Sequence, residues 1–170
     1  MGNKDKKYCL DTSGISNPLE SMPEDIHAVL WSKISKVISA GKIAVNTEIF
    51  DELSHINGLI GDCIKANCHN LLIEIGNVDW DWASYLKNVE RMTITHKNII
   101  SEYNGNRKGT VGLNDVSIVA MAKTLDLPLI SMEAKNFQSN EKRMRIPGLC
   151  LLEGVKHLAR RCFMWVGLQP

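Results

Sequence analysis

The stretch from Gly112 to Glu133 reads GLNDVSIVAMAKTLDLPLISME and carries the signals of one helix and one strand. Asn114 is a residue type that caps helices, and apolar residues follow it at helical spacing: Val116, Val119 and Ala120. Pro128 then precedes the short apolar run Leu129-Ile130-Ser131, which is typical of a buried strand. A helix that leads directly into a buried strand is the building unit of α/β proteins with a parallel sheet.

The same alternation continues toward the N-terminus. Tyr8-Cys9-Leu10 is predicted to be a buried strand that stops at a polar, turn-forming tip. Pro18 and Pro23 confine any helix before residue 24. The spacing of apolar residues then predicts four elements: a helix from Glu24 to the cap glycine Gly41, an extended segment at 43–45, a helix capped by Thr47, and a helix at 60–66.

The C-terminal half is also predicted to mix helices and strands. Residues 79–103 are largely helical in pattern, and residues 104–109 form a polar, glycine-rich loop. Leu149 to Leu152 is predicted to be extended, and residues 155–166 to form a closing helix. For residues 71–75 the pattern does not choose between strand and helix. We therefore expect an α/β fold with a central, mostly parallel sheet and helices on both faces.

The composition is that of one folded domain. The chain has 170 residues, of which 44% are hydrophobic and 23% charged, and this balance excludes a disordered or rod-like protein. We expect a single domain at 8–170, preceded by an N-terminal extension or tag remnant at 1–7. No apolar run approaches the roughly 18 to 20 residues that cross a bilayer, and Met1 is not followed by a signal-peptide core. We expect no membrane partner and a cytoplasmic location.

The five cysteines are scattered, with no Cys-x-x-Cys pair, as is typical of reduced intracellular thiols. Cys63, Cys68 and His69 are the nearest approach to a zinc site. Side chains five positions apart on a helix point in different directions, and no second pair of ligands exists. Small buried hydrophobic side chains are therefore the favoured interpretation of the cysteines.

The charge is divided unevenly along the chain, although the net charge is only +1. Residues 11–90 carry twelve acids and five lysines, whereas residues 91–170 carry twelve basic residues and six acids. A basic face beside an acidic pocket suits a metal-dependent nuclease, because phosphates are attracted while carboxylates hold the cation. A solvated surface of mixed charge is the alternative interpretation.

Four acids stand where an α/β fold places reactive groups. Asp11 directly follows the first strand, and Glu133 comes two residues after the strand that ends at Ser131. Asp115 lies in the first turn of its helix, and Glu52 lies on the polar flank of an earlier helix. In open α/β sheets the reactive crevice lies outside the carboxyl ends of the strands. Gathered there, these carboxylates would repel one another, and Mg²⁺ or Mn²⁺ would relieve that repulsion.

Each acid also has a purely structural interpretation. Asp11 can close an Asx-turn before Gly14, and Asp115 can complement the dipole of its helix. Glu52 and Glu133 can be ordinary solvated side chains. The functional interpretation therefore depends on all four acids meeting in the fold.

Four segments, in this order and spacing, resemble the PIN-domain ribonucleases, and more closely a PIN-like branch related to the toxin nucleases of bacterial toxin–antitoxin pairs. The segments are Tyr8-Cys9-Leu10-Asp11-Thr12-Ser13, Glu48-Ile49-Phe50-Asp51-Glu52-Leu53, Asn114-Asp115-Val116-Ser117-Ile118-Val119-Ala120-Met121-Ala122 and Leu129-Ile130-Ser131-Met132-Glu133. The resemblance spans nearly the whole chain and implies a three-layer PIN-like fold. One position departs from the family, because most PIN domains have Asp where Glu133 stands.

The resemblance implies a divalent-metal-dependent endoribonuclease. By position, the resemblance assigns catalysis and metal binding to Asp11, Glu52, Asp115 and Glu133, with Mg²⁺ or Mn²⁺ as the cofactor. The supporting hydroxyls would be those of Ser13, or less favourably Thr12, and Ser131. The implied partners are an RNA substrate, an antitoxin protein and a second copy of the chain.

Basic residues in the C-terminal half are the expected phosphate contacts: Arg107, Lys108, Lys135, Arg143 and Arg145. Trp80 or Trp82 would stack an unpaired base, although packing in the protein is the more common role of tryptophan. Two other functions stay open. One is a PIN-like binding module without catalysis, and the other is an aspartyl-phosphate phosphotransferase. The second is disfavoured because Asp11-Thr12-Ser13 lacks an aspartate two residues after the first.

Overall fold

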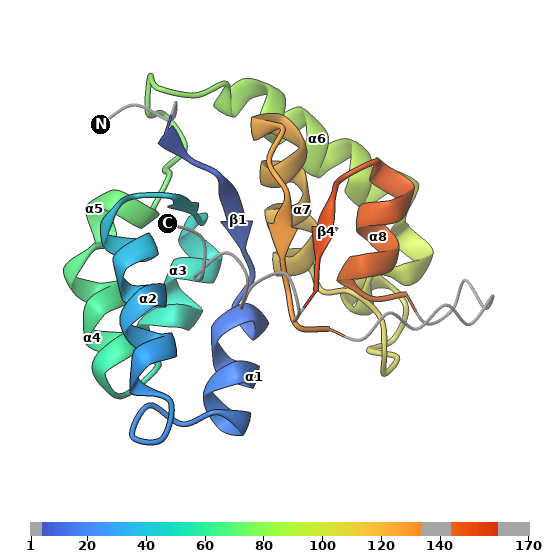
Figure 1. The fold of residues 1–170 in the computed structure, drawn as a ribbon. Coiled ribbons are helices and arrows are strands. Elements are labelled where there is room, and N and C mark those ends of the chain that lie inside the picture. The colour runs from blue at the N-terminus through green and yellow to red at the C-terminus, as the bar shows by residue number, and fades with distance from the viewer. Residues whose placement is uncertain (1–4, 134–143, 160–170) are drawn as a thin grey trace.

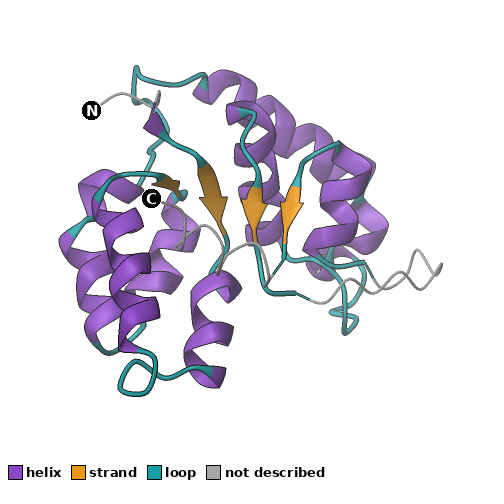
Figure 2. Ribbon diagram, viewed as in Figure 1, coloured by secondary structure: helices purple, strands orange, loops and turns teal. Residues whose placement is uncertain are grey.

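Four short parallel strands form the central sheet of the protein (Figure 2). A computed structural model describes residues 5–133 and 144–159. The strands are β1 (Tyr8–Leu10), β2 (Ile43–Ala44), β3 (Leu129–Ile130) and β4 (His157–Leu158). Their order across the sheet is β2-β1-β3-β4, with Tyr8 opposite Ile43, Cys9 opposite Leu129, and Leu129 opposite His157.

Helices cover the sheet in two groups (Figure 1). Helices α2 to α5 gather on one side of β1, and α6 to α8 gather on the other. The predicted three-layer α/β architecture with a parallel sheet is therefore confirmed. The helices are α1 (Ser13–Ser21), α2 (Ala28–Ser39), α3 (Thr47–Ser54), α4 (Leu59–Ala66), α5 (Cys68–Leu71), α6 (Trp82–Thr95), α7 (Leu113–Leu125) and α8 (Ile146–Glu153), with short 3-10 turns η2 (Lys97–Ile99) and η3 (Ser101–Tyr103).

The N-terminal elements form largely as their apolar spacing predicts. Cys9 and Leu10 of β1 are buried, as expected for a strand with neighbours on both sides. Helix α2 ends shortly before Gly41, whose φ of 68° lies in the left-handed region that favours glycine. Helix α1 ends before Pro23 but continues through Pro18.

The C-terminal part differs from the sequence prediction. Leu149 to Leu152, predicted to be extended, lies in α8, because Pro147 near the start of this helix occupies a turn whose N–H groups need no partner. The run is apolar on all sides, so its periodicity could not distinguish helix from strand. The helix predicted at 155–166 is also wrong at its start, since His157–Leu158 forms β4 beside β3. Residues 160–166 lie outside the described residues.

Two predicted helix caps are displaced by one or two residues. Thr47 is the first residue of α3, and the side chain of Asn46 caps that helix by accepting a hydrogen bond from Ile49 N at 3.1 Å. Helix α7 begins at Leu113, with Gly112 rather than Asn114 at its cap position. Asn114 is thereby free to use its amide elsewhere.

The N-terminal residues that are described contact the sheet. Lys7 N donates to Lys42 O at 2.8 Å, and Lys6 Nζ donates to Ile43 O at 2.8 Å and to Asn70 O. Burial lowers the pKa of Lys6 to about 8. Across the described ranges, none of the helices has the length and apolar character that spanning a membrane requires.

Candidate functional site

The sheet topology places two acids at one edge. The chain leaves β1 for β2 on one side, and later returns to β3 on the other side of β1. Such a reversal of strand order opens a crevice at the carboxyl ends of the strands. Asp11 follows β1 there, with its N–H donating to Ile130 O at 2.9 Å, and Glu133 follows β3.

Asp11 is a buried acid, with 5% of its surface exposed. Its Oδ2 atom accepts hydrogen bonds from Ser13 N at 3.1 Å and from the Ser13 hydroxyl. The same hydroxyl oxygen accepts from Met132 N at 3.0 Å. Ser13 therefore joins the ends of β1 and β3 and orients the Asp11 carboxylate. The Asx-turn that offers Asp11 a structural role is present as well.

Glu52 is held by two donors from other elements. Its Oε2 atom accepts from Thr12 Oγ1 at 2.5 Å, and its Oε1 atom accepts from Asn114 Nδ2 at 2.8 Å. Thr12 adjoins Asp11, and Asn114 adjoins Asp115. These contacts bring the exposed face of α3 against the end of β1 and the start of α7.

Asp115 lies in the first turn of α7, where its Oδ2 atom accepts from Gly112 N at 2.7 Å. The helix-start role is therefore present in the structure. Glu102 caps the same turn from η3, because its Oε1 atom accepts from Leu113 N at 3.0 Å. This fifth acid was not among the predicted site residues.

Glu133 is paired with the start of α8. Its Oε2 atom accepts from Ile146 N at 2.8 Å, and its Oε1 atom lies 3.3 Å from an Arg145 guanidinium nitrogen. Arg145, predicted to contact phosphate, therefore neutralises one of the four acids in this structure.

The two aspartates have strongly raised pKa values. Burial raises the pKa of Asp11 to about 6 against the opposing hydrogen bonds from Ser13, and the charges of Glu133 and Glu52 raise it further. Burial likewise raises the pKa of Asp115 to about 7, opposed by the Gly112 hydrogen bond and reinforced by the charges of Asp11, Glu133 and Glu52. The charges of Glu52 and Glu133 therefore act on both aspartates, and the charge of Asp11 also acts on Asp115.

The buried side-chain amide of Asn46 connects the start of α3 to α7. Asn46, which caps α3, also donates from Nδ2 to Ser117 Oγ at 2.7 Å. Ser117 Oγ donates in turn to Asn114 O at 2.7 Å. The cap of the helix that carries Glu52 is thus connected by hydrogen bonds to the backbone of the residue that holds Glu52.

Ser131 lies deeper in the molecule than the acids. It is fully buried, and its hydroxyl is 2.8 Å from His157 Nε2 on β4. The hydrogen bond joins the residue that follows β3 to the first residue of β4.

The predicted nucleic-acid contacts are distributed unevenly. Arg107 and Lys108 are exposed in the loop before α7, and Arg145 contacts Glu133. Lys135 and Arg143 lie outside the described residues. Trp80 is packed rather than available for stacking, since its ring centroid lies 4.9 Å from that of Tyr85 and its Nε1 donates to Glu74 O. Trp82 is partly exposed at the amino end of α6.

The sequence matches a family model over residues that include all the elements of the site. The family model described as a domain of unknown function, DUF4411, matches residues 8–164. The chain belongs to the DUF4411 family. The DUF4411 match includes every strand and helix that carries one of the four acids. No curated protein matches the sequence.

The donor chemistry of the DUF4411 site fits a hard divalent cation, although its side chains do not converge on one point. Carboxylate oxygens are the ligands that Mg²⁺ and Mn²⁺ prefer, and the raised pKa values of Asp11 and Asp115 indicate that added positive charge would be favourable. Within residues 5–133 and 144–159, no group of three or more His, Cys, Asp or Glu side chains is arranged to hold an ion. Glu52 and Glu133 each direct both oxygens to donors.

Sequence reasoning missed the residues that hold the acids. Asn114 was interpreted as a cap, and Asn46 and Glu102 carried no signal beyond their polarity. Their partners lie 62, 71 and 11 positions away in sequence for Asn114, Asn46 and Glu102, respectively. The local sequence carries no signal for the tertiary contact of the Asn114 amide, because Asp115 and Glu102 accept from the first N–H groups of α7 in its place.

Proposed function

We propose that this protein is a divalent-metal-dependent endoribonuclease that hydrolyses phosphodiester bonds. The observation that carries the proposal is that Asp11, at the carboxyl end of β1, and Asp115, at the start of α7, both have raised pKa values to which the charges of Glu52 and Glu133 contribute. Perturbed acids in a strand-end crevice are typical of catalytic sites. The resemblance to PIN-domain ribonucleases, carried by the same acids, supports the reaction class.

Asp11 and Asp115 are the residues that would hold Mg²⁺ or Mn²⁺, with Glu52 and Glu133 completing the set. Such a cation supplies charge neutralisation for a phosphate and lowers the pKa of water bound to it. Ser13 orients Asp11, and Thr12 with Asn114 orients Glu52. None of these roles requires a covalent nucleophile from the chain.

Arg145 has a second role in this proposal. A phosphate that enters the crevice competes with Glu133 for the guanidinium of Arg145, because phosphate offers the same charge-assisted, bidentate contact as a carboxylate. Transfer of Arg145 to the phosphate would free the Oε1 atom of Glu133, while Oε2 keeps its hydrogen bond from Ile146 N. Arg107 and Lys108 would hold phosphates farther along the strand.

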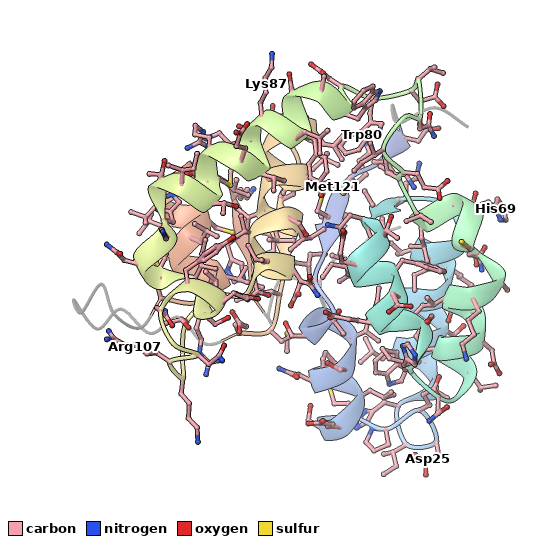
Figure 3. All side chains as sticks on the ribbon, turned by 180° about the vertical axis from the view of Figure 1, so that it is seen from behind. Asp25, His69, Trp80, Lys87, Arg107 and Met121 are labelled. Atoms are coloured by element: carbon pink, nitrogen blue, oxygen red, sulfur yellow. The ribbon has the colours of Figure 1, made fainter. Side chains whose placement is uncertain are left out.

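The decisive experiment compares matched Asp-to-Asn variants. Wild type is expected to cleave a labelled panel of tRNA, mRNA and single-stranded DNA in Mn²⁺ but not in EDTA, with RNA preferred. Asp11→Asn is expected to lower the rate at least 100-fold. Asp25→Asn makes the same change in the exposed loop between α1 and α2 and should cleave as wild type does (Figure 3). Equal cleavage by wild type and Asp11→Asn would falsify the proposed site.

A binding module without catalysis is the second candidate. It is favoured by the engagement of both oxygens of Glu52 and of Glu133 by protein donors. RNA binding without cleavage at any divalent ion concentration would support the binding module. Turnover of phosphatase substrates without RNA cleavage would instead support the aspartyl-phosphate class.

The proposal extends to a cytoplasmic toxin that acts on cellular RNA. Expression of wild type is then expected to arrest growth, and expression of Asp11→Asn is expected to be harmless. A neutralising antitoxin protein and a homodimeric state belong to the same proposal. Harmless expression of a protein that cleaves RNA in vitro would reject the toxin role and leave the nuclease assignment standing.

A further inference from the structure

A cleft of about 670 Å³ opens beside the carboxyl end of α6, and the proposed function has not used it. It lies between η2, η3 and α8, and its walls include Asn98, Tyr103, Asn104, Arg107, Met144 and Leu152. The volume falls within the roughly 300 to 1,000 Å³ that is usual for small-molecule and cofactor sites.

The walls offer four kinds of contact: an aromatic ring, a cation, an apolar surface and an amide. Tyr103 is 49% exposed, and the Lys97 ammonium lies 5.8 Å from the centroid of its ring. Arg107 is an exposed cation on the same wall. Leu152 adds an exposed apolar surface, and Asn98 adds an amide. A planar aromatic group that carries hydrogen-bonding edges and an attached anion matches this combination, and a nucleotide is such a group.

Two chain segments connect the wall of the cleft to the carboxylate site. Tyr103 follows Glu102, whose carboxylate accepts from Leu113 N in the same helix turn as Asp115. Met144 precedes Arg145, which is paired with Glu133. Arg107 lies at the end of the molecule opposite Trp80, so neither Trp80 nor the nearby start of α6 can serve this cleft (Figure 3).

We propose that this cleft is a subsite for one unpaired nucleotide of the RNA strand. The base stacks on Tyr103, and Arg107 contacts the attached phosphate. The inference rests on the proposed nuclease function and adds to it a base-binding site outside the four carboxylates, which a base paired in a duplex cannot enter.

Binding without catalysis tests the subsite. A fluorescein-labelled single-stranded RNA is titrated with protein in EDTA and followed by anisotropy. Tyr103→Ala is expected to weaken binding roughly 5- to 150-fold, since stacking of a base is worth about 1 to 3 kcal/mol and about 1.4 kcal/mol corresponds to a factor of ten. Tyr103→Phe keeps the ring and is expected to bind within about twofold of wild type. The same strand in a duplex is expected to bind more weakly.

Arg107 has a matched control on α6. Arg107→Ala is expected to weaken binding and to reduce the salt dependence by about one phosphate contact. Lys87→Ala removes an exposed cation that points away from the body of the protein and should bind as wild type does (Figure 3). Wild-type affinity in Tyr103→Ala, or an equal loss in Tyr103→Phe, would overturn the subsite.

The outcomes separate the two proposals. Binding that depends on the Tyr103 ring, without RNA cleavage, would reject the nuclease function and keep the subsite. RNA cleavage, together with RNA binding that does not change in Tyr103→Ala, would reject the subsite and keep the nuclease function. Competition by millimolar AMP or UMP as effective as competition by the oligonucleotide would show that the cleft takes a free nucleotide rather than a strand, and would overturn the strand assignment.

Discussion

Asn114 connects the proposed site to α3 and to the interior of α7 through its side chain and its backbone. It donates to Glu52 and accepts at its backbone from Ser117, and it immediately precedes Asp115. A carboxylate on an exposed helix face would otherwise sample several rotamers, each with a different position for its charge. Asn114 is therefore a positioning residue for Glu52.

Replacement of Asn114 is expected to affect activity more than stability. Asn114→Ala should lower the rate of RNA cleavage about tenfold and the unfolding free energy by less than ~1 kcal/mol, because the lost hydrogen bond is exposed. Cleavage rates and urea unfolding measure the two effects. Asn17→Ala, an exposed change on α1, is the control. A loss of stability without a loss of rate would contradict the positioning role.

The acids were predictable from sequence, but their partners were not. Asp11 and Glu133 could be placed because each follows a short apolar strand, and strand ends converge in a parallel sheet. Arg145 was expected to contact phosphate, and its pairing with Glu133 depends on α8, which the sequence pattern had predicted to be extended. Because residues 149–152 were predicted to be extended, the helix α8 that brings Arg145 to Glu133 was missed, and with it the ion pair.

At the start of α3, the residue that caps the helix also makes a tertiary hydrogen bond to α7. Asn46 caps α3 and is bonded to Ser117 of α7 in the interior, whereas Thr47, the cap expected from sequence, is one residue inside the helix. Both residue types are common caps, and boundaries shift readily by a residue. The long-range partner Ser117 lies 71 residues away, where local pattern carries no information.

The two candidate caps can be distinguished by matched alanine variants. Asn46→Ala is expected to lower the unfolding free energy by about 1 to 3 kcal/mol, because it removes the cap and leaves the buried Ser117 hydroxyl without a partner amide. Thr47→Ala is expected to change it by less than ~0.5 kcal/mol. Urea unfolding of both variants measures the difference. Equal losses of unfolding free energy in the two variants would show that the hydrogen bonds of the Asn46 side chain add no stability.

Helices α6, α7 and α8 are joined by a single acid. The buried Glu153 carboxylate accepts from Arg91, from His96 Nε2 at 2.7 Å and from Lys123 Nζ at 3.0 Å. Burial alone would raise its pKa, but these hydrogen bonds outweigh burial and lower the pKa to about 2. The ionised form is therefore the one that stabilises the fold.

Glu153→Gln is expected to reveal this pH dependence. The pKa in the unfolded chain is roughly 4.3, so the stabilisation is complete above that pH and is lost as the pH falls toward 2. At pH 7 the variant should be less stable than wild type by on the order of 2 kcal/mol. Unfolding in urea at pH 7, 5 and 3 should show the difference between the two proteins narrowing at pH 3. A difference that is constant with pH would contradict the role of the charge.

At the scale of the whole molecule, the fold buries the carboxyl groups of Asp11 and Asp115 near other acids, and the described part of the chain supplies no positive charge to either group that would offset their raised pKa values. Strand order and the α7 start place Asp11 and Asp115 where burial and neighbouring carboxylates oppose ionisation. Burial and repulsion among these carboxylates cost stability when they are ionised, and a cation bound as we propose would offset that cost. The chain's unfolding free energy should therefore depend on pH and on divalent ions together.

Without metal, the protein is expected to become less stable as the pH rises. The unfolded-state pKa of an aspartate is roughly 3.9, and the folded-state values are about 6 for Asp11 and about 7 for Asp115. Between these limits the folded state binds more protons, so the unfolding free energy falls from about pH 4 to pH 7 and then levels off. In EDTA, Asp115→Asn should be more stable than wild type at pH 8, by on the order of 2 kcal/mol, and nearly equal to wild type in stability at pH 4.

Millimolar Mn²⁺ should stabilise wild type at pH 8 and leave the stability of Asp115→Asn and Asp11→Asn nearly unchanged, because binding to the folded state requires both carboxylates. Thermal unfolding across pH 4 to 8, with and without Mn²⁺, measures both effects. If Asp115→Asn were instead destabilised equally at both pH values, helix capping through Gly112 would be the dominant role of Asp115.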